Sequence, residues 1–139
     1  MHLLDTDTLT HLHAGNPGVV HNLDRLADPD VATTIITKAE LLRGRIDFLL
    51  KAGTGSDLLR AQQFLARTEE LPAQIPVVPF DEAAAAQFKR LCATRALCKL
   101  GRADILVASI VLSRRAVLAT RNIRHFSKIA GLKAINWVD

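Results

Sequence analysis

The stretch Val31-Ala-Thr-Thr-Ile-Ile-Thr-Lys-Ala-Glu-Leu-Leu-Arg-Gly44 joins a strand-like run to a helix-like run. Its first residues are apolar or β-branched, which is typical of a strand buried on both faces. From about Lys38 onward the pattern becomes helical. The same succession of a short apolar run and a longer helical pattern recurs along the chain. This alternation predicts an α/β fold, a three-layer α/β/α sandwich with a mostly parallel central sheet.

The expected elements cover the whole chain, and its 139 residues fit one domain, 1–139, by the usual size of a domain. Strands are predicted at residues 2–4, 31–35, 77–78, 116–119 and 133–137. Helices are predicted to begin near Thr6, Gly18, Lys38, Asp57, Asp81 and Arg102. The segment 52–57 is expected to be a turn between helices, and the segment 71–76 a linker that returns to the sheet.

Three helix starts carry capping signals. Thr37 and Glu40 have the spacing of a capping box, so Thr37 is a candidate N-cap and Glu40 has a structural explanation besides any functional one. Asp81 is expected to cap the helix that follows it. Asp7 is expected to cap a helix starting near Thr8.

The composition is that of an ordinary soluble globular protein, with 49% hydrophobic and 23% charged residues. A net charge of +4 favours an anionic partner, although a solvated basic surface explains it equally well. Aromatic residues make up only 4% of the chain, which argues against base stacking as the main mode of nucleic-acid binding. No signal peptide and no apolar stretch of ~20 residues is found, so the protein is expected to be soluble and cytoplasmic, with no membrane contact.

The sequence contains no motif typical of a tight disulfide, a zinc site or a nucleotide-binding loop. Cys92 and Cys98 are expected on one helix at a spacing that suits neither a tight disulfide nor a zinc knuckle, which favours a reduced cytosolic setting. The five histidines show no zinc-ligand spacing. His125 is the one nearest the expected site, and a turn or packing role is predicted for it. Neither a phosphate-binding P-loop nor a dinucleotide fingerprint is present.

Three acids stand where apolar runs meet helical patterns, namely Asp5, Glu40 and Asp104. In a parallel α/β sheet, functional groups gather beyond the carboxyl ends of the strands. The acids are therefore expected to converge with the run 118–122, which follows a fourth strand. Clustered acids repel one another, so a cation should meet them. Oxygen ligands favour Mg²⁺ or Mn²⁺ over zinc.

Several segments in order resemble the PIN-domain ribonucleases, especially the VapC-type toxins of bacterial toxin–antitoxin pairs. They are Leu3-Leu-Asp-Thr-Asp7, Thr37-Lys-Ala-Glu-Leu-Leu-Arg-Gly44, Gly101-Arg-Ala-Asp-Ile-Leu-Val-Ala108, Ala119-Thr-Arg-Asn-Ile-Arg-His-Phe126, Ile129-Ala-Gly-Leu-Lys133 and Asn136-Trp137. The resemblance implies a toxin endoribonuclease that cleaves RNA with Mg²⁺ or Mn²⁺. It also implies a homodimer and a small cognate antitoxin as partner.

The resemblance assigns metal binding and catalysis to Asp5, Glu40 and Asp104. A fourth position, often Asp in the family, is Asn122 here, which offers an oxygen but no charge. Fewer anionic ligands should weaken a second metal more than the first. Asp7 is a candidate to make up the missing charge. Thr120 is expected either to bond a ligand carboxylate or water, or to form a turn.

The bound metal would lower the pKa of a water and offset charge on the leaving oxygen. Asp104 or Asp5 would then accept the proton, and the sequence leaves this choice open. The candidates for holding the RNA backbone are Arg43, Arg102, Arg121 and Arg124, because phosphate contacts position the substrate. Arg43 has a second possible role, as a counter-charge against the acids.

Two alternatives to the toxin stay open. One is a PIN nuclease of RNA processing, although processing nucleases usually carry additional domains. The other is a degenerate PIN domain that binds RNA or protein without cleavage, for which the neutral Asn122 is the argument. The three acids argue against it, because an unused anionic cluster carries an electrostatic cost.

Overall fold

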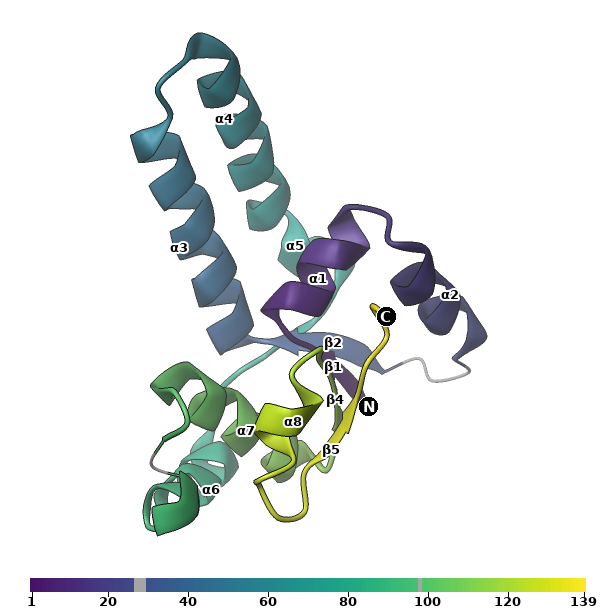
Figure 1. Ribbon diagram of the computed structural model, residues 1–139, viewed down its shortest axis with the longest axis vertical. Helices are drawn as coiled ribbons and strands as arrows, with labels where there is room; N and C mark the ends of the chain where they lie inside the picture. The colour runs from purple at the N-terminus through teal and green to yellow at the C-terminus, as the bar shows by residue number, and fades with distance from the viewer. Residues whose placement is uncertain (27–29, 98) are drawn as a thin grey trace.

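The structure is a computed structural model that describes residues 1–26, 30–97 and 99–139. It contains one five-stranded sheet in which every pairing is parallel (Figure 1). The strands are β1 (His2–Leu4), β2 (Val31–Thr34), β3 (Val77–Val78), β4 (Val117–Ala119) and β5 (Lys133–Ile135). The predicted α/β class is confirmed, and the sheet is parallel throughout.

The strand order is β3-β2-β1-β4-β5, so the first strand of the chain lies at the centre of the sheet. Leu4 at the end of β1 is in register with Thr33 of β2 and Ala119 of β4. The three central strands therefore end side by side, although more than a hundred residues separate β1 from β4. The chain changes direction across the sheet at this position, where α/β proteins commonly bind ligands.

Helices follow the strands as the sequence pattern predicts. They are α1 (Thr6–His13), α2 (Pro17–Arg25), α3 (Ile35–Lys51), α4 (Gly55–Glu69), α5 (Leu71–Gln74), α6 (Glu82–Cys92), α7 (Arg102–Arg114) and α8 (Ile123–Phe126), with a 3₁₀ turn, η1 (Arg95–Leu97). The predicted starts agree with these bounds to within a few residues. The segment expected to be a plain linker contains the short helix α5.

Two separate cores cover the two faces of the sheet. Leu3 and Leu118 face a core built largely from α6 and α7. The next residue of each strand, Leu4 or Ala119, faces a second core that includes Leu9 of α1. Side chains alternate between faces along a strand, so both faces are buried. The three-layer α/β/α prediction is confirmed.

α3 and α4 form an antiparallel hairpin that projects away from the sheet at the top of Figure 1. Near its tip, the side chains of Leu50 and Leu59 are 77% and 64% exposed. Further down, the Phe48 and Phe64 rings lie 6.1 Å apart and help to hold the two helices together. The hairpin thus has aromatic packing between its two helices and exposed apolar side chains at its tip.

The predicted capping box at the start of α3 is wrong. The helix begins at Ile35, and its N-cap is Thr34, whose Oγ1 accepts a hydrogen bond from the backbone N–H of Thr37 at 3.0 Å. Thr34 is the last residue of β2, so the strand passes directly into the helix. Glu40 consequently lies in the second turn and is free of the capping role. Asp81 does cap α6, through a 2.9 Å bond from the N–H of Ala84.

Two further sequence expectations concern the cysteines and membranes. Helix α6 ends at Cys92, and Cys98 lies outside the described residues. In the part of the chain that the structure describes, no helix has the length and apolar character needed to span a membrane.

Candidate functional site

Asp5 lies immediately after β1 and caps α1. Its Oδ1 accepts a hydrogen bond from the backbone N–H of Thr8 at 2.8 Å. The hydroxyl of Thr8 donates to the carbonyl of Ala119 at 2.9 Å, which ties the start of α1 to β4. Asp5 is therefore held where the start of α1 is bonded to β4. The prediction that Asp7 caps this helix is wrong, because Asp5 has that role.

Glu40 faces α1 from the second turn of α3. Its Oε1 accepts a hydrogen bond from the Thr6 hydroxyl at 2.9 Å. Thr6 is the first residue of α1 and directly follows Asp5. This bond between the two helices brings Glu40 to the same edge of the sheet as Asp5.

Asp104 lies in the first turn of α7, and its carboxylate contacts α8. Its Oδ2 is 2.7 Å from Nε2 of His125. Both side chains are about one-third exposed. His125 also stands edge-on to the ring of Phe126. The packing predicted for His125 is present, but its contact with Asp104 could not be read from the sequence, because 21 residues separate the two.

One pocket at the carboxyl edge of the sheet brings the predicted ligands together. It is lined by Asp5, Thr6, Asp7, Thr37, Glu40, Asp104, Val107, Asn122 and Phe126. Asn122 reaches it from the turn after β4. The buried Thr120 shapes that turn, because its Oγ1 accepts a 3.0 Å hydrogen bond from the N–H of Asn122. Thr120 therefore has the turn-forming role, one of the two expected for it.

The donor set of the pocket suits a hard divalent cation. Asp5, Glu40 and Asp104 each use one carboxylate oxygen in a hydrogen-bond contact, and the other oxygen has no hydrogen-bond partner among the described residues. Within residues 1–26, 30–97 and 99–139, no three acidic, histidine or cysteine side chains are grouped closely enough to hold one metal as they stand. Each carboxylate is instead turned toward its protein partner. The three carboxylates are half-buried and line one pocket, and rotation of their side chains would turn the second oxygens toward a common cation, whose preferred donors they are.

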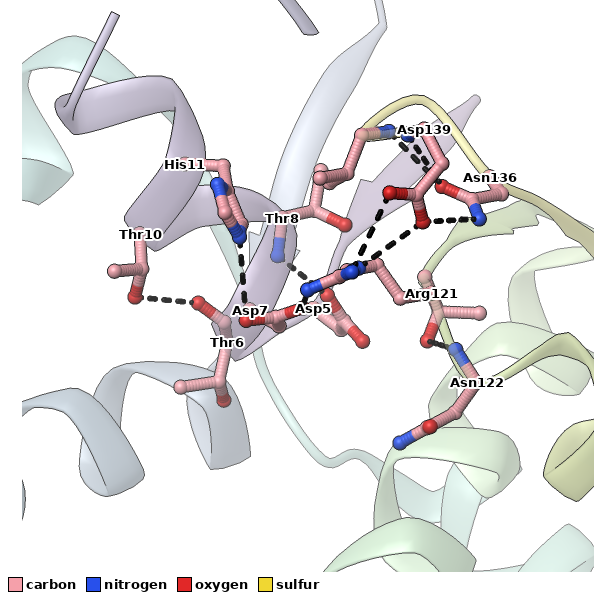
Figure 2. Close-up of polar contacts among 12 residues, drawn as sticks. Asp5, Thr6, Asp7, Thr8, Thr10, His11, Arg121, Asn122, Asn136 and Asp139 are labelled. Carbon is pink, nitrogen blue, oxygen red and sulfur yellow. Dashed lines mark hydrogen bonds and ion pairs between the residues drawn. The ribbon is translucent and has the colours of Figure 1, made fainter. Parts of the chain in front are cut away.

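Asp7 belongs to the rim of the pocket and is engaged by cations. It lies 3.7 Å from Nε2 of His11 and 3.7 Å from a guanidinium nitrogen of Arg121. Arg121 also pairs with Asp139 at 3.2 Å, so it lies between two acids (Figure 2). Its hydrogen bond to Asp139 is the main reason that the Arg121 pKa is raised. Bonds from Asn136 and then Arg121 lower the pKa of the Asp139 carboxyl.

The four predicted RNA-binding arginines are in different surroundings. Arg43 is exposed on α3 and forms no ion pair with a carboxylate in the described part of the chain. Arg102 lies with its guanidinium carbon 5.7 Å from the centre of the Phe88 ring. Arg121 and Arg124 line a second hollow beside the acidic pocket.

A parallel sheet whose central strands present an acidic pocket defines the class: an α/β protein with a site suited to divalent cations. The family follows from sequence comparison. The family model described as "PIN domain" matches residues 2–132. The chain belongs to the PIN-domain family, which confirms the resemblance. PIN-domain proteins are generally hydrolytic nucleases that use divalent metal ions.

Solved structures agree with this fold. The chain is similar to a structure of VapBC-1 from nontypeable Haemophilus influenzae, with a TM-score of 0.78 and 22% identity over 99% of this chain and 98% of that one. It is similar to FitAcB from Neisseria gonorrhoeae, with a TM-score of 0.75 and 25% identity over 98% and 97%. It is also similar to FitAB bound to the IR36 DNA fragment, with a TM-score of 0.77 and 28% identity over 100% and 96%. No curated protein sequence matches the chain.

Proposed function

We propose that this protein is an endoribonuclease that cleaves RNA phosphodiester bonds with Mg²⁺ or Mn²⁺ held by Asp5, Glu40 and Asp104. The observation that carries the proposal is that these acids come from three separate segments and line one pocket. Asn122 lines it too and would add a neutral oxygen. An all-oxygen donor set favours these two metals over zinc.

The chain's own residues orient the acids. The N–H of Thr8 fixes Asp5, and the Thr6 hydroxyl fixes Glu40, so each presents its other oxygen. A divalent ion bound there would activate a water and offset charge on the phosphate. Asp5 and Asp104 remain the two candidates for accepting the proton of that water. Because Asp104 is the acid in contact with His125, it has a nearby group to which the proton can pass.

We further propose that the protein acts as a toxin, in the cytoplasm where RNA is found, and that a small antitoxin inhibits it. The similar structures named VapBC-1 and FitAB support this, and a structure from Klebsiella pneumoniae is described as a toxin–antitoxin complex. The apolar tip of the α3–α4 hairpin supplies surface for a protein partner, whether an antitoxin or a second copy of the chain. The homodimer remains a prediction, which the mass of the purified protein in solution would test.

The proposal is tested with purified wild-type protein, Asp104→Asn and the control Asp47→Asn. Asp47 is an exposed acid of α3 that does not line the pocket. Single-stranded RNA is incubated with each protein in Mg²⁺, in Mn²⁺ and in excess EDTA. We expect wild type and Asp47→Asn to cleave RNA in either metal and to stop in EDTA. Asp104→Asn should lose at least a hundredfold in rate, or about 2.7 kcal/mol of transition-state stabilisation.

Expression of the same proteins in a bacterial host tests whether the protein acts as a toxin. Growth arrest by wild type and Asp47→Asn, but not by Asp104→Asn, is the expected result. RNA cleavage without growth arrest would favour an RNA-processing nuclease. Binding of RNA without cleavage in any metal would favour a domain that binds without cutting.

A further inference from the structure

A second hollow lies directly beside the acidic pocket. It is lined by Arg121, Asn122, Arg124, His125 and Lys128. Four of these five side chains are basic. Asn122 lines both this hollow and the acidic pocket, so the two sites share a wall.

Two of the basic side chains are available to a ligand. Arg124 and Lys128 are exposed, and neither forms an ion pair with any residue that the structure describes. Arg121 differs, because Asp7 and Asp139 already hold it (Figure 2). Arg124 and Lys128 can therefore each pair with an anion that enters the hollow.

The backbone of this segment holds the hollow in shape. The N–H groups of His125 and Phe126 both donate to the carbonyl of Asn122 at 3.1 Å. The Ser127 hydroxyl donates to the carbonyl of Arg124 at 2.8 Å. His125 connects the hollow to the acidic pocket through its 2.7 Å contact with Asp104. The backbone that carries the basic residues is therefore held next to Asp104.

We propose that this hollow binds a backbone phosphate of single-stranded RNA adjacent to the phosphate at the acidic pocket, with Arg124 and Lys128 as the contacts. The RNA strand would pass from one site to the other over Asn122. The inference rests on the proposed ribonuclease function and adds a position and a direction for its substrate.

The chemistry points to phosphate rather than to a base. Guanidinium and ammonium groups recognise phosphate oxygens, and such contacts position the strand without reading its sequence. The hollow has no Phe or Trp in its lining, and its one imidazole, that of His125, is held by Asp104, so stacking is not its main mode of binding. Binding through it should therefore be insensitive to base sequence.

Binding is measured without cleavage, by fluorescence anisotropy of a labelled single-stranded RNA in excess EDTA at several salt concentrations. The proteins are wild type, Arg124→Ala, Lys128→Ala and the double variant. Matched controls are Arg90→Ala on α6 and Lys51→Ala at the tip of the hairpin, both exposed and outside the hollow. Each loss of a phosphate contact on a single strand should reduce the slope of log K against log salt by about 0.7.

We expect both single variants to weaken binding, equally for RNAs of different sequence, and the double variant to lose about 1.4 in slope, which is twice 0.7. Each variant should raise KM for cleavage and leave kcat unchanged, because the contact is made before and during the reaction. Slopes equal to those of the controls would overturn the inference, even if RNA is cleaved. If the salt slopes change in the variants but no protein cleaves RNA, the proposed ribonuclease function would be wrong and the proposed phosphate site would stand.

Discussion

At the scale of single residues, one carboxylate of the site has both a structural and a proposed chemical role. Asp5 caps α1 with one oxygen and lines the acidic pocket. A carboxylate at a helix N-terminus is stabilised by the N–H groups and the dipole there, so its negative charge is supported near two other acids. The two roles can be separated by substitution.

Asp5→Ala and Asp5→Asn should both abolish cleavage, but only Asp5→Ala should lose the cap. Asn retains the oxygen that accepts from the Thr8 N–H, so Asp5→Ala should be less stable than Asp5→Asn by about 1 kcal/mol. Urea unfolding followed by circular dichroism measures the difference. Both substitutions relieve repulsion among the acids, so this comparison isolates the cap. Equal stability would show that the bond to Thr8 contributes nothing.

Asn122 is the neutral member of the pocket, and the charge at this position should control metal affinity. We expect Asn122→Asp to tighten Mn²⁺ binding about tenfold, or about 1.4 kcal/mol, because it adds an anionic ligand. Isothermal titration measures the affinity. Asn16→Asp, at the N-cap of α2, adds the same charge away from the pocket and is the control. Unchanged affinity in Asn122→Asp would place this residue outside the metal site.

At the scale of elements, the end of α1 packs on the α3–α4 hairpin through a histidine. Both ring nitrogens of His13 are buried and have no hydrogen-bond partner among the described residues. Burial is the main cause of its lowered pKa, followed by the charges of Arg67 and Arg45. Arg45 comes from α3 and Arg67 from α4. A protonated His13 would therefore be repelled by a positive charge on each of the two helices.

The stability of the protein should therefore fall as the pH drops below the ordinary histidine pKa of about 6.5. In that range the unfolded chain binds a proton that folded His13 does not bind, so the free energy of unfolding rises with pH. At a pH well below about 6.5, His13 of the unfolded chain is fully protonated. The loss of stability stops growing once His13 of the folded protein is protonated as well. Urea unfolding between about pH 5 and pH 7 would measure the slope.

His13→Leu removes the proton site and keeps an apolar side chain, so its slope should be smaller than that of wild type. His21→Leu changes an exposed histidine of α2 and serves as the control. If His13→Leu and wild type show the same slope, burial of His13 does not govern acid stability.

At the scale of the whole molecule, an acidic pocket lies in a chain of net charge +4. Its acids come from the first residues, from α3 and from α7, and only the folded chain brings them together. A divalent ion that binds the folded state and not the unfolded state must raise stability. A bound metal would therefore couple the chemistry of the site to the stability of the fold.

Mn²⁺ should raise the thermal unfolding midpoint of the wild type above its value in EDTA. At a concentration a hundred times the dissociation constant, the gain is about 2.7 kcal/mol. Asp104→Asn should lose most of this gain, whereas Asp47→Asn should retain it. Differential scanning fluorimetry records the midpoints. An equal gain in Asp104→Asn would mean that the ion stabilises the protein from another position.

The local pattern predicts the elements well because strands and helices differ in the period of their apolar residues. All five strands and the start of α7 lie where the pattern places them. Capping was less predictable: Thr34 and Thr37 are both good N-cap residues, and the choice between them depends on where β2 leaves the sheet. The same holds for Asp5 and Asp7, since the contact of Thr8 with β4 selects Asp5.

The sequence by itself determined the fold class, the family and the residue types of the acidic site, because these depend on local periodicity and on ordered motifs. Only the tertiary structure decided that β1 lies between β2 and β4, that His125 contacts Asp104, and that a basic hollow adjoins the acids. These features depend on strand order and on contacts between residues far apart in the chain. Strand order and these contacts form only when the sheet assembles and both of its faces are buried. No single stretch of sequence therefore predicts them.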